Sequence, residues 1–252
     1  MKRILFLSTY DSDPYFNMAA EEYFFNLVEN DSIYGVLRFF TWKPVSISLG
    51  YYQKIKYFDL DEIDKDGIKI VRRLTGGNAI LHKNDFTYSL IIKNEMNDLL
   101  VKKDFYHYLA NILKNSLTTL GVECNIKGDL EISEVNPDCF NSPSQYEIVD
   151  KNGNKLVGSA QKISKKCLLQ HGSFFCNYDT QMIKKYFIYE GFKNSKTNSF
   201  YHNELIDVMT IEKAFYDSFK SQFELINYTL KEDDLLNIKN LSDIKYSKSE
   251  WN

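Results

Sequence analysis

The spacing of apolar residues separates predicted helices from predicted strands along this chain. A first strand is predicted over residues 3–8. Asp13 and Pro14 then begin a helix, because the carboxylate can cap the first turn, proline fits the first helical position, and apolar residues follow every three to four positions. A second amphipathic helix is predicted over 103–120 and ends at Gly121. Each helix has one apolar stripe and is therefore expected to cover one side of a sheet.

Shorter apolar runs, bounded by glycine, proline and polar turns, predict the remaining elements. The predicted strands cover residues 34–41, 45–50, 67–73, 78–82, 86–93, 145–150, 155–164 and 167–176. The further predicted helices cover residues 59–66, 179–189 and 231–246, together with a helix that Thr210 caps and whose apolar face is Ile211, Phe215, Phe219 and Phe223. This mixture predicts an α+β fold, with one mixed β-sheet flanked by helices. No linker divides the chain, so residues 1–252 are expected to form one domain.

Composition and charge exclude several classes of function. The formal net charge of −3 argues against nucleic acid as the main partner, since a phosphate backbone requires a basic face. The longest apolar runs are far too short to span a membrane. The apolar run 4–7 is also too short for a signal peptide, and Asp11 and Asp13 follow it closely. The four cysteines lack zinc-like spacing, so no metal site is predicted and a reducing cytoplasm is the expected location.

Paired glycines and adjacent arginines mark the first candidate site. The run from Arg72 to His82 contains Gly76 and Gly77 between two predicted strands. Glycines let the backbone approach a ligand closely, and arginine supplies forked donors of fixed charge. The combination suits an acyl carboxyl, a phosphate or the prosthetic group of a carrier. A hairpin with solvated arginines explains the same spacing, and the residues alone leave both readings open.

A cysteine in an irregular segment marks the second candidate site. Residues 127–144 show no consistent period, and a loop this long inside a compact domain often carries function. Cys139 lies in this segment beside polar residues, where a thiol is free to react. Cys124, Cys167 and Cys176 fit the alternative role of small buried residues, because two of them lie in apolar strand runs.

Two sequence blocks resemble the biotin/lipoate protein ligase superfamily. The first runs from Arg72 to Tyr88, and the second comprises Lys155 to Gln161 followed by Leu169 to Ser173. Asn17 to Glu22 and the final Glu250-Trp251-Asn252 fit the same pattern. Cys139-Phe140 followed by Pro143-Ser144-Gln145-Tyr146-Glu147 is most similar to octanoyltransferases of the LipM type. The resemblance implies the same α+β catalytic domain, and it implies that this chain lacks the accessory C-terminal domain of long lipoate ligases.

The resemblance also assigns roles to individual residues. Cys139 would be the nucleophile, and Lys155 would lower its pKa and hold the acyl carbonyl. The residues that would bind the acyl substrate are Arg73, Gly76, Gly77, His82, Gly158, Ser159, Ala160 and His171. One departure is Asn78-Ala79, where related sequences often have Gly or Arg followed by Gly, and this affects the expected shape of the pocket mouth.

The activity that the resemblance implies is octanoyl transfer in lipoate biosynthesis. The donor would be octanoyl-acyl carrier protein, and the acceptor a lysine of a lipoyl domain or of the glycine-cleavage H protein, with no cofactor. Because such partners are commonly acidic, a basic rim is expected from Lys54, Lys56, Arg72 and Lys83. The alternatives are an ATP-dependent lipoate-protein ligase, an amidotransferase that moves lipoyl or octanoyl groups between lipoyl proteins, and a non-catalytic acyl-binding module.

Overall fold

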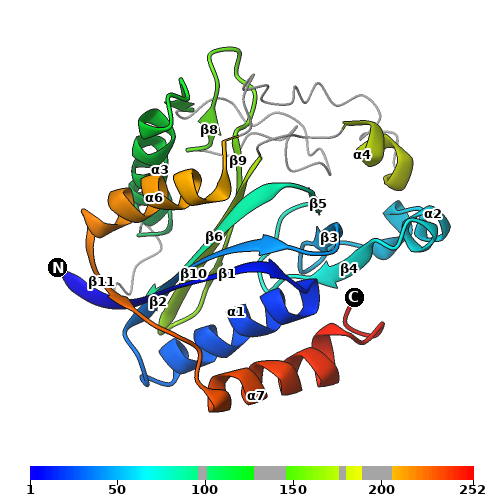
Figure 1. The fold of residues 1–252 in the computed structure, drawn as a ribbon, viewed down its shortest axis with the longest axis horizontal. Helices are drawn as coiled ribbons and strands as arrows, with labels where there is room; N and C mark the ends of the chain where they lie inside the picture. Colours follow the sequence, from blue (N-terminus) through cyan, green and yellow to red (C-terminus); the bar gives the residue numbers. More distant parts are fainter. Residues whose placement is uncertain (96–100, 128–145, 176–179, 189–205) are drawn as a thin grey trace.

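A computed structural model describes residues 1–95, 101–127, 146–175, 180–188 and 206–252 of the chain (Figure 1). The strands are β1 (Lys2–Ser12), β2 (Gly35–Trp42), β3 (Ser46–Leu49), β4 (Lys69–Arg72), β5 (Ile80–His82), β6 (Asp85–Lys93), β7 (Asn125–Ile126), β8 (Ile148–Val149), β9 (Val157–Ile163), β10 (Cys167–Phe175) and β11 (Phe223–Asn227). The helices are α1 (Pro14–Glu29), α2 (Leu60–Lys65), α3 (Val101–Thr119), α4 (Thr180–Tyr186), α6 (Val208–Lys220) and α7 (Glu232–Leu241), with a 3₁₀ turn at Ile55–Tyr57 and a π-helical turn at Ser242–Tyr246.

Six strands form the main sheet, in the order β11-β1-β2-β6-β10-β9. β1 runs parallel to both β11 and β2, whereas β2, β6, β10 and β9 are successively antiparallel. The predicted mixed sheet flanked by helices is therefore confirmed. The prediction that Phe223 extends the face of the preceding helix is wrong, because Phe223 begins the edge strand β11. Thr210 is not the cap of α6 either: the carboxylate of Asp207 accepts the Thr210 N–H.

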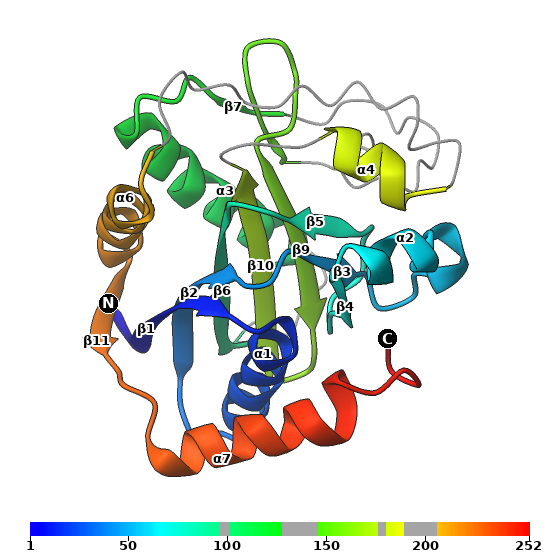
Figure 2. The same ribbon diagram turned by 45° about the vertical axis from the view of Figure 1, so that its right-hand side comes forward.

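Helices cover both faces of the main sheet (Figures 1 and 2). α1 lies against one face and α7 packs beside it, while α3 and α6 cover the other face. Asp13 caps α1 and Pro14 occupies its first turn, as the sequence predicts. The core under α3 and α6 is strongly aromatic, and Phe39, Phe86 and Phe215 are fully buried there. The face under α1 differs, since several polar side chains of the sheet are buried against that helix.

A separate three-stranded sheet forms beside the main one, in the order β4-β3-β5. β2 leads into it through the cis Lys43–Pro44 bond. Its apolar residues pack with those of α2 and α4, where Phe58 and Phe187 lie edge to face. The periodic pattern of the sequence locates these three strands but does not distinguish them from the main sheet. The arrangement brings the Arg72–His82 region next to β9 and β10.

Arg72 fastens the last residues of the chain to the small sheet. Its guanidinium donates to the carbonyl oxygens of Gly50, Gln53 and Trp251 at 2.7–2.9 Å. Its backbone N–H donates to Asn252 Oδ1 at 2.8 Å, and the Trp251 indole donates to its carbonyl oxygen. Arg72 thus has a structural role, and its contribution to a basic rim stays a prediction.

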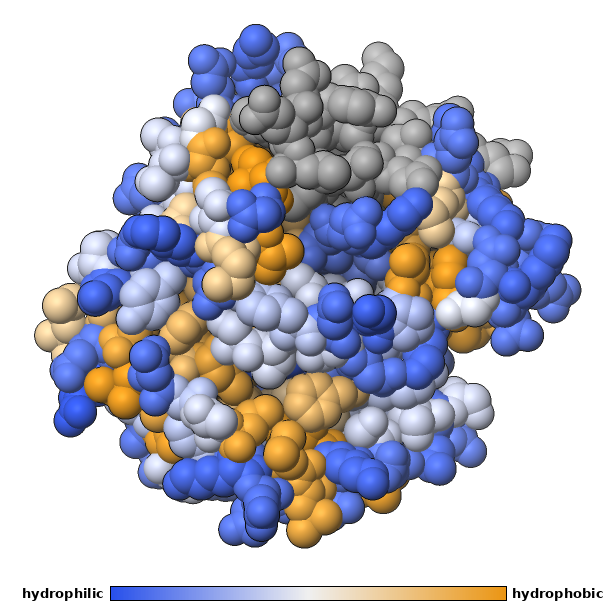
Figure 3. All heavy atoms as spheres, viewed as in Figure 1, coloured by the Kyte–Doolittle hydropathy of each residue, from blue (hydrophilic) through white to orange (hydrophobic). Residues whose placement is uncertain are grey.

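The surface seen in Figure 3 is mostly hydrophilic, with apolar residues reaching it over α7 and beside α2. Leu235 and Leu236 of α7 are among the exposed apolar side chains. Within the described part of the chain, no helix is long and apolar enough to cross a membrane.

Candidate active site

A narrow cavity lies between the β9–β10 end of the main sheet and the small sheet. It is lined by Trp42, Ser48, Arg73, Ile80, His82, Thr87, Gly158, Ser159, Ala160, His171, Gly172 and Ser173. Six of the residues expected to bind substrate are in this wall. The other two, Gly76 and Gly77, lie in the turn between Arg73 and β5. The cavity volume is about 10 Å³, room for about one water molecule, so a larger ligand has to push the walls apart.

Strand register explains why residues far apart in sequence meet in this wall. Gly158 of β9 lies opposite Ser173 of β10, and Ser173 lies opposite Thr87 of β6. Two residues further along the sheet, Ala160 lies opposite His171. Because side chains alternate between the faces of a strand, these rows share one face. The small glycine and alanine side chains at β9 leave open space beside the polar residues of β10.

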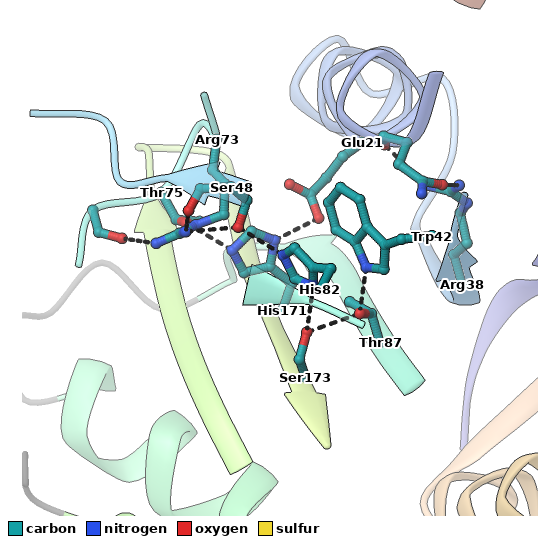
Figure 4. A network of polar contacts seen from close by, with 12 residues as sticks. Glu21, Arg38, Trp42, Ser48, Arg73, Thr75, His82, Thr87, His171 and Ser173 are labelled. Carbon is teal, nitrogen blue, oxygen red and sulfur yellow. Dashed lines mark hydrogen bonds and ion pairs between the residues drawn. The ribbon is translucent and has the colours of Figure 1, made fainter. Parts of the chain in front are cut away.

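Arg73 is buried in the cavity wall and donates hydrogen bonds to neighbouring backbone and side chains (Figure 4). Nη1 donates to the carbonyl oxygen and the hydroxyl of Ser48, at 2.7 and 2.9 Å. Nη2 donates to the carbonyl oxygens of Gly76 and Asn78, both at 3.0 Å, and Nε to Thr75 Oγ1 at 3.3 Å. Five acceptors match the five N–H groups of a guanidinium. Arg73 therefore shapes the glycine turn and the wall.

His82 lies between a hydroxyl and a carboxylate. Its Nε2 is 2.7 Å from Ser48 Oγ, and its Nδ1 is 2.6 Å from Asp85 Oδ2. Its ring also stacks on Trp42, with ring centroids 3.8 Å apart, and the Trp42 indole donates to Thr87 Oγ1. Burial lowers the pKa of His82, and the opposing effect of Asp85 does not offset it. The sequence patterns do not identify Ser48 as a functional residue. For Asp85 the one available signal is its spacing, three residues after His82.

His171 has a similar pair of neighbours. Its Nε2 is 2.7 Å from Thr75 Oγ1, and its Nδ1 is 2.7 Å from Glu21 Oε1 on α1 (Figure 4). Burial acts to raise the pKa of Glu21, but His171 and, more weakly, Arg38 lower it further, so that the net pKa lies below its ordinary value. Both histidines thus contact a hydroxyl through Nε2 and a carboxylate through Nδ1.

Lys155 forms a buried ion pair with Glu147 at the start of β9. The two side chains are 3% and 2% exposed. A turn at 150–154 precedes Lys155, in which the Asp150 carboxylate accepts two backbone N–H groups. In the sequence, Glu147 is notable only as the last residue of the Pro143–Glu147 motif. The spacing of the two residues does not predict its contact with Lys155.

The cysteines divide into buried thiols and positions outside the described residues. Cys124 and Cys167 are buried, and burial raises the pKa of both thiols. Both therefore have little thiolate at neutral pH, as expected for structural cysteines. Cys139 and Cys176 lie outside the described residues.

Of the other expected rim lysines, Lys54 and Lys56 are exposed and Lys83 is half-buried. Across the described ranges, no group of three or more His, Cys, Asp or Glu residues is arranged to hold a metal ion.

Comparison with known families identifies the family to which this fold belongs. The model of the lipoyl protein ligase A/B catalytic domain matches residues 13–220, which include α1, the three-stranded sheet, four strands of the main sheet, the cavity wall and Lys155. This chain belongs to the lipoyl protein ligase A/B catalytic domain family.

Several relatives in this family match nearly the whole chain. Octanoyltransferase LipM of Staphylococcus aureus (strain NCTC 8325 / PS 47) is 33% identical over 268 residues, covering 98% of this chain and 96% of that protein. Octanoyltransferase LipM of Bacillus subtilis (strain 168) is 30% identical over 269 residues, with the same coverage. These relatives confirm the predicted class of activity, octanoyl transfer by an acyltransferase.

Solved structures of the family have the same fold. A bipartite lipoate protein ligase from Thermoplasma acidophilum has a TM-score of 0.78 and 22% identity, over 100% of this chain and 95% of that one. A lipoate-protein ligase A bound with ATP has a TM-score of 0.76 and 23% identity, over 99% and 97%. At this level of identity the likeness establishes the fold alone.

Close packing of two glycines generates a prediction for this family member. A Cβ at Gly50 would lie 1.7 Å from the carbonyl oxygen of Gly77, whereas a Cβ at Gly76 would have no heavy atom within 4 Å. We expect Gly50→Ala to lower the free energy of unfolding by at least about 2 kcal/mol, because the backbone of the turn must move. Gly76→Ala, the matched control, should change it by less than about 1 kcal/mol. Chemical denaturation measures both, and equal stabilities of the two variants would contradict the packing described.

Proposed function

We propose that this chain moves an octanoyl group from octanoyl-acyl carrier protein to a lysine of a lipoyl domain or of the glycine-cleavage H protein, through a thioester on Cys139. The observation that carries the proposal is the position of Lys155 and Glu147. Lys127 and Tyr146 lie on either side of the segment that contains Cys139, and the Tyr146 N–H donates to the Lys127 carbonyl oxygen at 3.0 Å. Glu147, the next residue, pairs with Lys155.

The length of the chain limits the reach of the proposed nucleophile. Cys139 precedes Tyr146 by seven positions, and an extended chain of that length reaches at most about 25 Å. Lys155 is followed within three residues by Gly158, the first cavity residue of β9. The proposal therefore requires the thiol to approach the β9 end of the cavity, with the acyl chain extending along Gly158 and Ala160 toward Trp42.

Two transfers complete the reaction. The Cys139 thiolate attacks the donor thioester carbonyl, a new C–S bond forms, and the carrier thiol leaves after taking up a proton. The neutral ε-amine of the acceptor lysine then attacks the Cys139 thioester, forming an amide and returning the cysteine sulfur, while the amine gives up one proton. Lys155 would stabilise negative charge at the thiol and at the carbonyl oxygen in both transfers. Exchange between thioesters needs no energy source, so no ATP is required.

The relatives favour this reaction over ATP-dependent ligation. The solved ligases share less than 25% identity with this chain. The octanoyltransferases share 30% and 33% over nearly all of it.

The acyl-enzyme provides the direct test of the nucleophile. After mixing with octanoyl-acyl carrier protein without ATP, we expect the intact mass of the protein to rise by one octanoyl group, and Cys139→Ser to abolish this adduct. Serine keeps the shape but stays protonated at neutral pH. Cys124→Ala and Cys167→Ala are the controls and should still form the adduct. Octanoyl transfer by the Cys139→Ser protein, or an adduct on another cysteine, would refute the mechanism.

The Lys155–Glu147 pair predicts a pH-dependent defect. Lys155→Met removes the positive charge that the proposal assigns to the neighbourhood of the thiol, and the thiol pKa should therefore rise. Because only the thiolate attacks, acylation at pH 7 should become about tenfold slower if that pKa rises by about 1. The rate should partly recover as the pH rises toward about 8.5, where an ordinary thiol ionises. Stopped-flow acylation between about pH 6 and 9 measures this recovery.

A double variant separates catalysis from stability in this test. Lys155→Met alone leaves a buried carboxylate without its ion pair and is expected to destabilise the fold by about 3–5 kcal/mol. Lys155→Met with Glu147→Gln removes both charges and should regain most of that stability while keeping the acylation defect. Restored acylation in the double variant would contradict the role of Lys155 in lowering the thiol pKa.

A further inference from the structure

One continuous chain of polar contacts crosses the cavity wall, with Arg73 at its centre (Figure 4). In order, its seven side chains are Glu21, His171, Thr75, Arg73, Ser48, His82 and Asp85. The two arms have the same sequence of chemical groups outward from Arg73: a hydroxyl, an imidazole and a carboxylate. All seven side chains are buried. They come from α1, the small sheet, the glycine turn, β10 and the start of β6.

Arg73 sets the direction of hydrogen bonding in both arms. A guanidinium only donates, so the hydroxyls of Ser48 and Thr75 accept from it. Each hydroxyl still has one hydrogen to donate, and among the described residues the acceptor within reach is the Nε2 of its histidine, 2.7 Å away in both cases. An Nε2 that accepts carries no proton, so the proton of the neutral ring is on Nδ1.

The carboxylates require the same direction. Asp85 Oδ1 and Glu21 Oε2 are buried without a hydrogen-bond donor among the described residues. The histidine Nδ1–H is therefore a main donor to each carboxylate. Arg73 lies close to His82, and Arg38 lies close to Glu21, so each arm has a positive charge nearby. Burial also favours the neutral form of His82, whose pKa it lowers.

We propose that Arg73 is a specificity-determining residue for the acyl group. It directs every hydrogen-bond donor of the two arms to an acceptor within the same series of side chains, which makes this polar wall compatible with an unsubstituted acyl chain. This inference rests on the proposed octanoyl transfer and identifies what selects the acyl tail. An apolar chain then meets no unpaired donor in the Arg73-centred wall. A chain with a hydroxyl near its end finds Nε2 already occupied at both histidines, and its buried hydroxyl loses its hydrogen bonds to water.

The tautomers can be measured without any assay of activity. In protein labelled with ¹⁵N at histidine, we expect both His82 and His171 to show a protonated Nδ1 and an unprotonated Nε2 at pH 7. The chain contains four histidines, so single replacements assign the signals. Ser48→Ala should shift the Nε2 signal of His82 alone, and Thr75→Val that of His171 alone, while Arg73→Gln should shift both. If Arg73→Gln fails to fold, the other two variants still test each arm separately.

The acyl selectivity gives the functional readout. We expect the wild-type protein to prefer octanoyl- over 8-hydroxyoctanoyl-acyl carrier protein by about 100-fold in kcat/KM. Ser48→Ala removes the hydroxyl that occupies His82 Nε2, so the substrate hydroxyl can donate there, and the preference should fall below about tenfold. Ser46→Ala is the matched control, because Ser46 is an equally buried residue of β3 whose hydroxyl donates to Pro44 instead. It should keep the wild-type preference.

The outcomes separate this inference from the proposed function. A protonated Nε2 on either histidine at pH 7, or an unchanged selectivity in Ser48→Ala, would overturn the role of Arg73. A wild-type protein that transfers no octanoyl group but shows both predicted tautomers would refute the proposed function and leave the hydrogen-bond chain established.

Discussion

A buried guanidinium imposes the strictest requirement on this fold. Arg73 is 2% exposed, and an arginine in such a place must have acceptors for its N–H groups, because an unmade hydrogen bond to a buried charge costs several kcal/mol. The acceptors come from β3 and from the turn between Arg73 and β5. The close approach of Gly50 to Gly77 holds that turn in place. Arg73 thus links the small sheet to the polar groups of the cavity wall.

The two adjacent arginines have different roles: Arg72 stabilises the fold, and Arg73 lies in the cavity wall. Successive residues of a strand point to opposite sides, so Arg72 and Arg73 cannot serve the same place. Arg72 fastens the last residues of the chain through their carbonyl oxygens. Arg73 faces the cavity and orders its polar groups. Adjacency in the sequence therefore does not place the two arginines at one site.

Much of the fold could be predicted from local signals, and the exceptions have a common physical cause. Asp13-Pro14 and Gly121 mark helix ends through short-range chemistry, and those boundaries are confirmed within a few residues. The prediction for Phe223 is wrong because one apolar residue at helical spacing fits the end of a helix and the start of an edge strand equally well. Ser48 and Asp85 could not be predicted from the sequence, because their role depends on the contacts with His82 that tertiary packing creates.

The same holds for Glu147, whose contact with Lys155 depends on the turn at 150–154. Six of the expected binding residues lie in one cavity wall. They could be predicted because they belong to glycine-containing motifs that are recognisable in the sequence. The role of Cys139 stays a prediction.

The central claim is that the cavity beside β9 holds the acyl chain while Cys139 carries it. A crystal structure of the isolated octanoyl-enzyme tests this most directly. The account predicts a thioester at Cys139 and an acyl chain that runs along Gly158 and Ala160 toward Trp42, with the Arg73 hydrogen bonds unchanged. An acyl chain outside this cavity, or one whose carbonyl oxygen accepts directly from Arg73, would contradict it.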